Sequence, residues 1–543
     1  MPFKLIAAAG DEQYLGIGMA DSLIVSLSKI GDLQVRPTAS VAPFAASGAN
    51  PIAAGRELKI EAILDGKIHQ SGDNLRINLQ LIRVADGNLL WAEKFDGTMS
   101  GIFRLEDEIS AFIAQKLRRN LDENTLRLLT TRGTKTLAAY QAFLKARFHF
   151  HQGSPEHYQK SNAFYAEAIR LDQNFAQAYA GLADVYILEV IFNLRRPQDA
   201  FAEVKEAVTK AVELDSTSAE VYAAHAHFNI CFNRDLAEAG RNAEKAVELN
   251  PYSATAHNLL GQSLMFRGFY AEAETALKQA LEIDPLGFWH ICLLTICYFL
   301  WRKHERAIAQ TLTTTAINPK LYAEVIKRCW SLTELGRHAE AFALYEEVST
   351  QPGGESVIWF VGNAYAVTGE TEKARAVLAQ LKEMSAAMYV SPFFFALVHA
   401  GLNETKTAID YIEQTVENRD PWRVFIYADP RLDNLRSDSR FQRLVNFIVP
   451  EAVRIKEDAP APPNLTTPSE PNRNNADPKR GEREIRTIPA TAFKSRKTAR
   501  LAAACITLVI LASGIGYALY NFANRPTVHG LRFHAAQSTA MSY

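Results

Sequence analysis

The sequence lacks the features that most directly indicate an enzyme or a nucleic-acid-binding protein. Lysine and arginine number 59 against 60 acidic residues, so the formal net charge is -1 and no broad positive field exists to steer nucleic acid. No G-x-x-x-x-G-K-[ST] motif occurs, and no nucleophile, base and orienting residue can be grouped from sequence alone. We therefore expect a non-enzymatic chain without cofactor, metal ion or direct nucleic-acid contact.

Cysteine is also scarce. The five cysteines lie scattered in apolar segments without the spacing of a disulfide framework, which favours reduced core residues and a cytosolic setting for the soluble part. The N-terminal MPFKLIAAAG has no long apolar stretch, so it is not a signal peptide. The cysteines are Cys231, Cys292, Cys297, Cys329 and Cys505.

Two kinds of short motif suggest chemistry but fit it poorly. Gly16-x-Gly18 lacks the third glycine of a dinucleotide-binding loop. His149-x-His151 and His225-x-His227 resemble metal-binding pairs, yet residues two apart on a helix point roughly 200° away from each other. We interpret these histidines as ordinary groove or surface residues.

The chain divides into parts with different patterns. Residues 1–125 mix helical and strand-like periods, whereas residues 138–448 are almost wholly helical in pattern. Residues 457–498 are rich in proline, asparagine and charge, a composition that cannot offset chain entropy by burial, so we expect a disordered linker. Residues 501–522 carry no charge, and residues 523–543 form a short tail.

The uncharged run LAAACITLVILASGIGYALYNF predicts a transmembrane helix, since about 20 apolar residues span a bilayer. Four basic residues precede it between positions 494 and 500, which places the N-terminal bulk in the cytoplasm and the helix in the inner membrane. Ala512-x-x-x-Gly516 and Gly514-x-x-x-Ala518 could pair helices in a homo-oligomer, although such spacings are common by chance.

A 34-residue repeat sets the architecture of the helical region. Pro251, Pro285, Pro319 and Gly353 are spaced 34 apart. The best unit, AHNLLGQSLMFRGFYAEAETALKQALEIDP, has small residues where two helices would cross and a proline where the second helix would stop. This pattern resembles the tetratricopeptide family, which stacks helix pairs into a superhelix. We expect about eight helix pairs, with an insertion of about nine residues in the unit after Asp172.

The resemblance implies that the concave face holds proteins or peptides. Numbering by the period gives one inward-facing ladder on the first helices and a neighbouring partial ladder. Amides there can bond an extended peptide, and tryptophans can anchor an apolar side chain; the other interpretation is that these residues are solvated or pack between repeats. The candidates are Asp184, His227, Asn258, Gln262, Trp330, Trp359 and Asn363, with Ile296 in the same ladder.

The N-terminal part predicts a small α/β sandwich with a β-meander. Residues 14–30 have a helical period, LQVRP (33–37) is strand-like, and Leu75, Ile77, Leu79 and Leu81 alternate with polar residues as in a half-buried strand. Turns are expected at SGDN and ADGN, and a closing amphipathic helix at residues 102–117.

This part, over residues 2–118, resembles the TolB N-terminal-like domain of bacterial signalling proteins, which precedes tetratricopeptide repeats. In that family an effector often stands in front, such as a winged-helix, adenylate cyclase or kinase domain. The chain begins within the expected first strand, so an effector is expected to be missing or to act in trans. ENRDPWRVFIYADPRLDNLRSDSRFQRLVNFI resembles the terminal cap of such repeats. Three functions are considered: a membrane-anchored scaffold or sensor that binds proteins, the regulatory part of a signalling or transcription system, and an enzyme with an unrecognised site. The first is the one we expect, and the second is the alternative.

Overall fold

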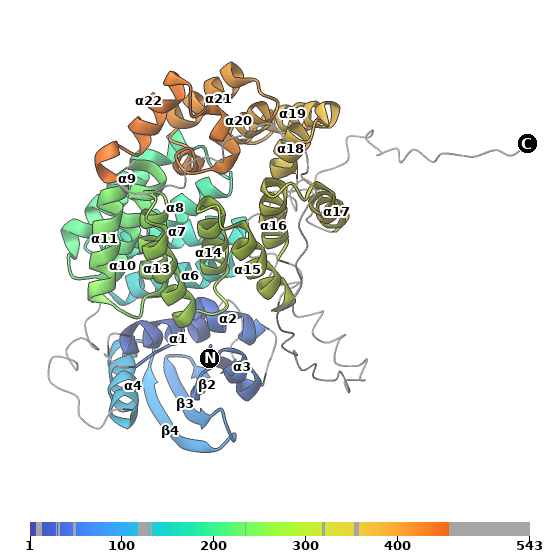
Figure 1. The fold of residues 1–543 in the computed structure, drawn as a ribbon. Helices are drawn as coiled ribbons and strands as arrows, with labels where there is room; N and C mark the ends of the chain where they lie inside the picture. Colours follow the sequence, from blue (N-terminus) through green and yellow to red (C-terminus); the bar gives the residue numbers. More distant parts are fainter. Residues whose placement is uncertain are drawn as a thin grey trace, which may run out of the picture.

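The protein consists of a small α/β domain beneath a curved stack of helices (Figure 1). The computed structural model describes residues 1–454 apart from 7–13, 29, 31–32, 47–49, 118–128, 130–132, 234, 318–320 and 352–357. The expected linker, transmembrane helix and tail lie outside the described residues. Within the described part of the chain, no helix is long and apolar enough to cross a membrane.

The α/β domain is built on a four-stranded sheet of order β1-β2-β3-β4. β1 pairs parallel with β2, and the other neighbours are antiparallel. The turns fall at the expected SGDN and ADGN segments, and Leu75, Ile77, Leu79 and Leu81 are buried on one face of β3, so the expected meander is confirmed. The strands are β1 (Lys4–Ile6), β2 (Ala62–Ser71), β3 (Asn74–Arg83) and β4 (Leu89–Thr98).

Four helices complete this domain in the part of the chain that the structure describes. The helical period predicted at residues 14–30 is found in α1 (Tyr14–Leu27), whose apolar stripe packs into the domain core, and the closing helix is α4 (Ile102–Leu117). The other two helices are α2 (Thr38–Ala46) and α3 (Pro51–Glu57). Gly16 admits no side chain because the Phe3 carbonyl oxygen lies 2.2 Å from where a Cβ would sit, so this glycine serves close packing.

The strand expected at residues 33–37 is wrong: this segment pairs with no strand and connects α1 to α2. Pro37 at its end has no N–H for a sheet ladder. Arg36 instead donates to three carbonyl groups, those of Leu58 at 3.1 Å, Ile283 at 2.6 Å and Glu282. The segment therefore joins the α/β domain to the helix stack.

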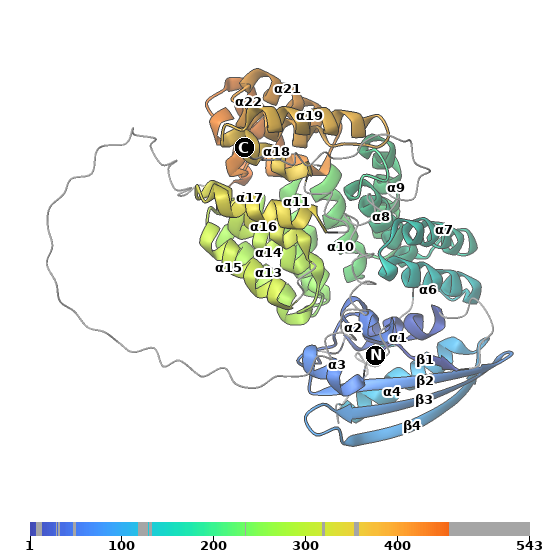
Figure 2. The same ribbon diagram turned by 90° about the vertical axis from the view of Figure 1, so that its right-hand side faces the viewer.

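The stack contains sixteen helices in eight consecutive pairs within the described residues. Figures 1 and 2 show these pairs following one another around a curved path. The helices are α6 (Leu137–Gln152), α7 (Pro155–Leu171), α8 (Ala176–Ile191), α9 (Pro197–Leu214), α10 (Ala219–Phe228), α11 (Leu236–Leu249), α12 (Ala254–Met265), α13 (Tyr270–Ile283), α14 (Phe288–Leu300), α15 (His304–Ile317), α16 (Tyr322–Glu334), α17 (His338–Ser349), α18 (Ile358–Val367), α19 (Thr371–Ser385), α20 (Pro392–Gly401) and α21 (Thr405–Glu417).

Small residues let the paired helices approach, as the repeat predicts. Gly261 of α12 faces α13 so closely that an added Cβ would lie 2.6 Å from Leu277 Cγ. Ala273 and Ala280 of α13 are fully buried at the same crossing. One departure from regular helix follows α10, where Asn229–Asn233 forms a π-helical turn, η2.

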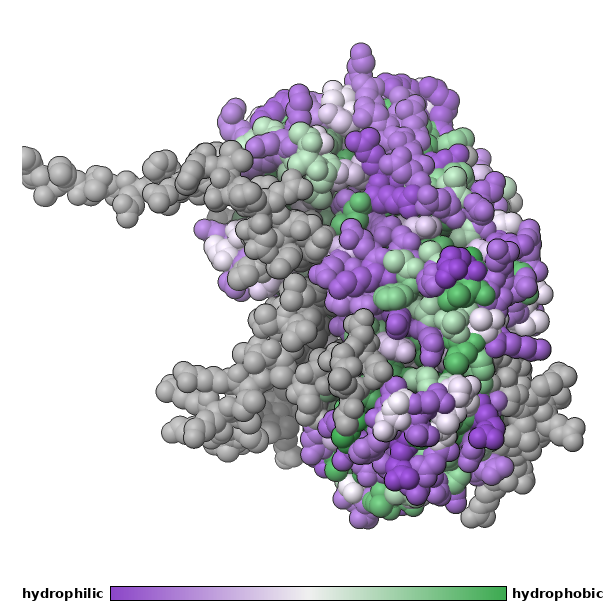
Figure 3. Space-filling model, turned by 180° about the vertical axis from the view of Figure 1, so that it is seen from behind, coloured by the Kyte–Doolittle hydropathy of each residue, from purple (hydrophilic) through white to green (hydrophobic). Residues whose placement is uncertain are grey.

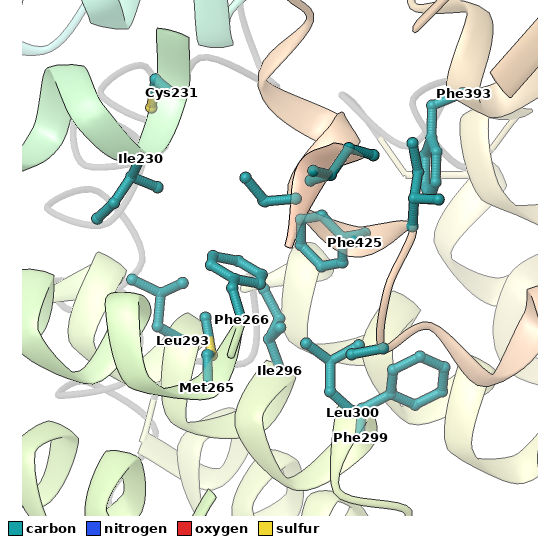
Figure 4. Packing of buried hydrophobic residues seen from close by; sticks show 14 of the residues in the cluster. Ile230, Cys231, Met265, Phe266, Leu293, Ile296, Phe299, Leu300, Phe393 and Phe425 are labelled. Carbon is teal, nitrogen blue, oxygen red and sulfur yellow. The ribbon is translucent and has the colours of Figure 1, made fainter. Parts of the chain in front are cut away.

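Residues 420–454 form a terminal segment of short helices that turns back onto the stack. Phe425 packs against Phe266, which closes α12, with ring centroids 5.2 Å apart, and lies near Ile296 of α14 (Figure 4). Arg267 donates to the Val453 carbonyl at 2.9 Å. We call residues 420–454 the C-terminal segment; its elements are η4 (Pro421–Phe425), η5 (Pro430–Leu435), α22 (Ser439–Ile448) and η6 (Glu451–Val453).

The α/β domain docks on the first half of the stack. Asp21 of α1 is 2% exposed and forms an ion pair with Arg147 of α6, which also lies 3.6 Å from Glu220 of α10. The ends of later repeats add further polar contacts, since Asn250 donates to Ser28 at 3.2 Å. Burial raises the pKa of Asp21, but Arg147 and His151 outweigh this and hold the pKa well below its ordinary value.

Candidate partner-binding face

The inward-facing residues expected from the repeat do not share one environment. They come from the first helices of successive pairs: Asp184 on α8, His227 on α10, Asn258 and Gln262 on α12, Trp330 on α16, and Trp359 and Asn363 on α18. The structure separates them into a polar group on the earlier repeats and a group packed within the protein. These two groups have different capacities for binding a partner.

The polar group comprises Asp184, His227, Asn258 and Gln262. His227 Nδ1 lies 3.1 Å from Asp184 Oδ1, with the two side chains 18% and 32% exposed. Gln262 Nε2 donates to Asn258 Oδ1 at 2.8 Å. The Asn258 Nδ2 amide is buried and has no hydrogen-bond partner among the described residues, which leaves a costly unmet donor on this face.

Electrostatics distinguish His227 from the other histidines of the stack. Burial lowers its pKa, but the neighbouring Cys231 thiol and the Asp184 carboxylate outweigh burial and raise the pKa to about 10. His225, two residues earlier, instead stacks against Phe228 and has a pKa lowered by burial. The side chains of His225 and His227 thus point toward different partners, as the helix geometry predicts.

The other candidates are packed against the chain itself. Trp330 is 4% exposed and lies under Arg431 of η5, whose guanidinium carbon is 4.4 Å from the ring centroid. Trp359 packs edge-on against Phe394, with centroids 5.1 Å apart. Asn363 donates to the Leu397 carbonyl at 2.8 Å. In this conformation these three side chains support packing between repeats and the C-terminal segment.

Arg431 explains why the second half of the inner face is covered. It donates to both carboxylate oxygens of the buried Asp429, at 2.9 and 2.6 Å, and lies over Phe299 as well as Trp330. Arg302 of the stack forms a second link, with nitrogens 2.8 Å from the Asp433 carboxylate oxygens. Cation–π and charge-assisted contacts of this kind are strongest when shielded from water.

Sequence reasoning missed this covering function, although a signal for its local structure is present. Asp420, Asp429 and Asp438 are nine residues apart, and each begins a short helix by accepting a backbone N–H two residues on, at 2.8, 3.0 and 2.7 Å. This period predicts three successive helix starts. It does not reveal that the turns lie against α12, α14 and α16.

The outer surface provides fewer distinct features. Seen from behind, the molecule is mostly hydrophilic, with hydrophobic residues in small groups (Figure 3). A surface hollow between α13, α14 and α15 contains Glu274, which accepts from Tyr298 at 2.8 Å and pairs with Lys278 at 2.6 Å. These charges satisfy one another, so the inner polar group remains the stronger candidate.

Comparison with known families also separates the α/β domain from the helix stack. Residues 1–112 match the HilA/YgeH-like transcriptional regulator, second domain, and residues 254–286 match the tetratricopeptide repeat. The repeat assigned from the 34-residue period is thereby confirmed. The α/β domain is similar to a domain of transcriptional regulators, and its resemblance to the TolB N-terminal-like domain stays a prediction.

One curated relative is "Putative adenylate cyclase 3" of Rhizobium meliloti (strain 1021), 27% identical over 193 residues. The match covers 35% of this chain, which spans about a third (32%) of the relative's length.

Solved structures that resemble parts of the chain include Pseudomonas aeruginosa PilF. It is 19% identical, and the match covers 37% of this chain and 91% of that one, with a TM-score of 0.28. A thermophilic tetratricopeptide protein of Thermus thermophilus is 17% identical, covering 36% of this chain and 99% of that one, with a TM-score of 0.30. The human IFIT1 dimer with m7Gppp-AAAA is 14% identical, covering 63% and 77%, with a TM-score of 0.41.

Proposed function

We propose that this protein is a scaffold or sensor that binds a protein partner through the polar group of the inner face. The observation that carries the proposal is the buried Asn258 amide, whose Nδ2 lacks an acceptor among the described residues. An extended peptide supplies carbonyl acceptors at regular intervals. Asp184 and His227 stand on the two preceding first helices and are partly exposed, so a peptide crossing these helices would meet acidic, basic and amide groups in turn.

The second half of the inner face also favours partner binding at the early repeats. Trp330 and Trp359 are the strongest apolar anchors predicted from sequence, yet both are packed inside the chain. A partner would therefore engage α8, α10 and α12 while the C-terminal segment occupies α14 and α16. The tetratricopeptide repeat matched at residues 254–286 includes Asn258 and Gln262.

Site-specific photo-crosslinking tests this proposal. A benzophenone amino acid at Gln262 should give protein adducts in cells, whereas the same probe at the exposed Glu272 of α13 serves as the control. Asn258→Leu should abolish the Gln262 adduct because it removes the amide at nearly the same volume. Equal adducts from both probe positions, or an adduct that survives Asn258→Leu, would contradict a binding role for this face.

A second candidate function is regulation of transcription or cyclic-nucleotide signalling. The matches of residues 1–112 to a regulator domain and of the chain to a relative named as an adenylate cyclase favour it. In this proposal an effector on another polypeptide reads the state of the α/β domain and repeats. Co-purification of a winged-helix or cyclase protein, lost on deleting residues 1–117, would support it; capture that is unaffected by the deletion would contradict it.

Membrane attachment through residues 501–522 remains part of the proposal. The uncharged run and the preceding basic cluster support it. The full chain should sediment with membranes and resist carbonate extraction, and a chain lacking residues 501–522 should not. Release of the full chain by carbonate would exclude a spanning helix.

A further inference from the structure

The sheet of the α/β domain ends at a long strand with an open outer edge. β4 has ten residues and is the last strand in the order β1-β2-β3-β4, whereas β1 at the other margin has three residues. Figures 1 and 2 show β4 at the lower margin of the molecule, on the side of the sheet away from the helix stack. Such an edge presents a row of backbone N–H and C=O groups to which another strand can pair.

The hydrogen bonds between β3 and β4 identify the backbone groups that face outward. Met99 N–H donates to the Asp73 carbonyl at 2.7 Å, and these two residues continue the antiparallel register of the two strands. Successive residues of such a strand direct their backbone groups alternately to either side, so the odd-numbered residues of β4 bond to β3. The N–H and C=O groups of Ala92, Lys94 and Asp96 therefore face the open edge.

This edge has few of the features that keep natural sheet edges from pairing. β4 contains no proline, and Leu89 and Leu90 at its start are exposed. The shift in register with β3 also lies at that end of the strand. The outward N–H of Lys94 reaches the exposed side chain of Glu93, at 3.2 Å, which a second strand could displace. Pairing therefore depends on how the charges of β4 would meet those of its partner.

Two copies related by a two-fold axis can pair along this edge in few registers. Pairs that exchange hydrogen bonds must join residues whose backbone groups face the gap, which are Ala92, Lys94 and Asp96. Centring the pairing on Glu93, Lys94 or Asp96 sets like charges opposite each other, which is destabilising. A centre nearer either end of β4 pairs fewer residues or includes the register shift. Centring it on Phe95 sets Lys94 of each copy opposite Asp96 of the other, so the charges of β4 complement one another.

We propose that two copies of this protein pair through β4 about a two-fold axis at Phe95, so that their sheets become continuous. The pairs of Lys94 with Asp96 exchange backbone hydrogen bonds and bring opposite charges together. Phe95 stays covered by its own α4, where its ring centroid lies 5.4 Å from that of Phe112. The helix stacks lie on the far side of each sheet from β4 (Figure 1), so the two stacks point away from each other.

The dimer formed in this way should be weak. The interface consists of the middle of one strand from each copy, which is smaller than the interfaces of permanent dimers. We therefore expect monomer and dimer to exchange, with the dimer increasing as the protein concentration rises. A weak interface also makes the equilibrium sensitive to the charges at Lys94 and Asp96, because each cross-strand pair occurs twice.

Sedimentation velocity of the full chain tests the proposal, with mild detergent present because of the uncharged run at residues 501–522. The wild-type chain should shift from monomer to dimer with concentration. Lys94→Asp should weaken the dimer by about tenfold or more, because both cross-strand pairs become repulsive. Lys67→Asp makes the same change at an exposed lysine of β2 and is the control; it should leave the dimer unchanged.

Mixing two variants tests the register. Asp96→Lys alone should also remain monomeric, whereas a mixture of Lys94→Asp with Asp96→Lys should form a heterodimer, since each variant strand then faces opposite charges. Asp96 also pairs with Arg76 at 2.6 Å; should Asp96→Lys unfold the domain, the comparison of Lys94→Asp with Lys67→Asp still decides.

Two results would overturn the proposal. One is an equal dimer in Lys94→Asp and Lys67→Asp, which is also the result expected if the small residues at positions 512–518 hold the dimer together. The other is a wild-type chain that stays monomeric at every concentration, which would leave the edge of β4 open to a strand from another protein.

Discussion

Replacing Arg147 with methionine should loosen the α/β domain from the helix stack. Arg147 is the arginine that pairs with Asp21. Its Nη2 donates to Asp21 Oδ1 at 2.9 Å. The substitution keeps most of the side-chain volume but leaves the Asp21 carboxylate buried without its guanidinium. Removing one partner of a buried ion pair costs about 3–5 kcal/mol.

The structure favours the lower end of that range. The Arg147 side chain is 21% exposed, and Asp21 keeps a hydrogen bond from Thr38 and a weaker contact with His151 at 3.5 Å. A loss of about 3 kcal/mol corresponds to roughly a 150-fold change in the opening equilibrium, since about 1.4 kcal/mol is a factor of ten. Amide hydrogen exchange in α1, followed by mass spectrometry, should accelerate by that factor.

Two comparisons make this expectation refutable. Arg170→Met breaks an exposed pair with Glu167 on α7 and should change exchange by less than about fivefold, because exposed pairs contribute at most about 1 kcal/mol. Adding Asp21→Asn to Arg147→Met should recover part of the loss, since a neutral amide no longer leaves a buried charge. If α1 exchanges alike in Arg147→Met and Arg170→Met, the ion pair does not hold the domain.

The same pair predicts an acid response. The pKa of Asp21 is depressed in the folded protein by Arg147 and His151, which outweigh the opposing effect of burial. Its contribution to stability is therefore complete above the unfolded pKa of about 3.9 and is lost as pH falls below that value. Exchange in α1 should rise below about pH 4, and the rise should be smaller in the Asp21→Asn, Arg147→Met double variant.

Three other outcomes are expected. Gly261→Ala should lower the unfolding free energy by about 1–3 kcal/mol in urea titrations because of its crowded helix crossing, while Gly240→Ala should be nearly neutral; equal effects would contradict the packing argument. Burial lowers the pKa of His304 to about 4, so thermal stability should fall as pH drops from about 6.5 to 4, and His304→Gln should flatten the profile. Arg431→Ala should leave Asp429 buried and unpaired, and exchange in η5 should rise about a hundredfold; unchanged exchange would exclude Arg431 as the fastening residue.

Sequence patterns predicted most helices and strands because these elements depend on the spacing of neighbouring residues. Alternating Leu75, Ile77, Leu79 and Leu81 face one side of β3 since side chains alternate along a strand. The 34-residue repeat predicted helix crossings at Gly261 because only a small residue fits there. The strand expected at residues 33–37 does not form. Pro37 has no N–H to donate to a neighbouring strand, and Arg36 binds carbonyl groups that are distant in the sequence.

The inner face could be predicted only in part from the sequence. A repeat period determines which residues point inward, but it does not say which segment will cover them. Trp330 is covered by Arg431, about a hundred residues later in the chain. The contact between Asp184 and His227 spans 43 residues, which is one 34-residue period plus the insertion of about nine residues. The contact between Asp184 and His227 could therefore be predicted from the repeat period and the insertion. The position of the covering segment depends on tertiary packing and could not.

Two sets of contacts hold the assembly together, and they share no residue. The α/β domain is fastened by Asp21 with Arg147 and by the bond from Asn250 to Ser28. The C-terminal segment is fastened by Arg302 with Asp433 and by other residues of the second half. Because distant contacts without shared partners contribute nearly additively, we expect the loss of one set to leave the other in place. We therefore expect a partner that displaces the C-terminal segment to uncover Trp330 while the α/β domain stays docked.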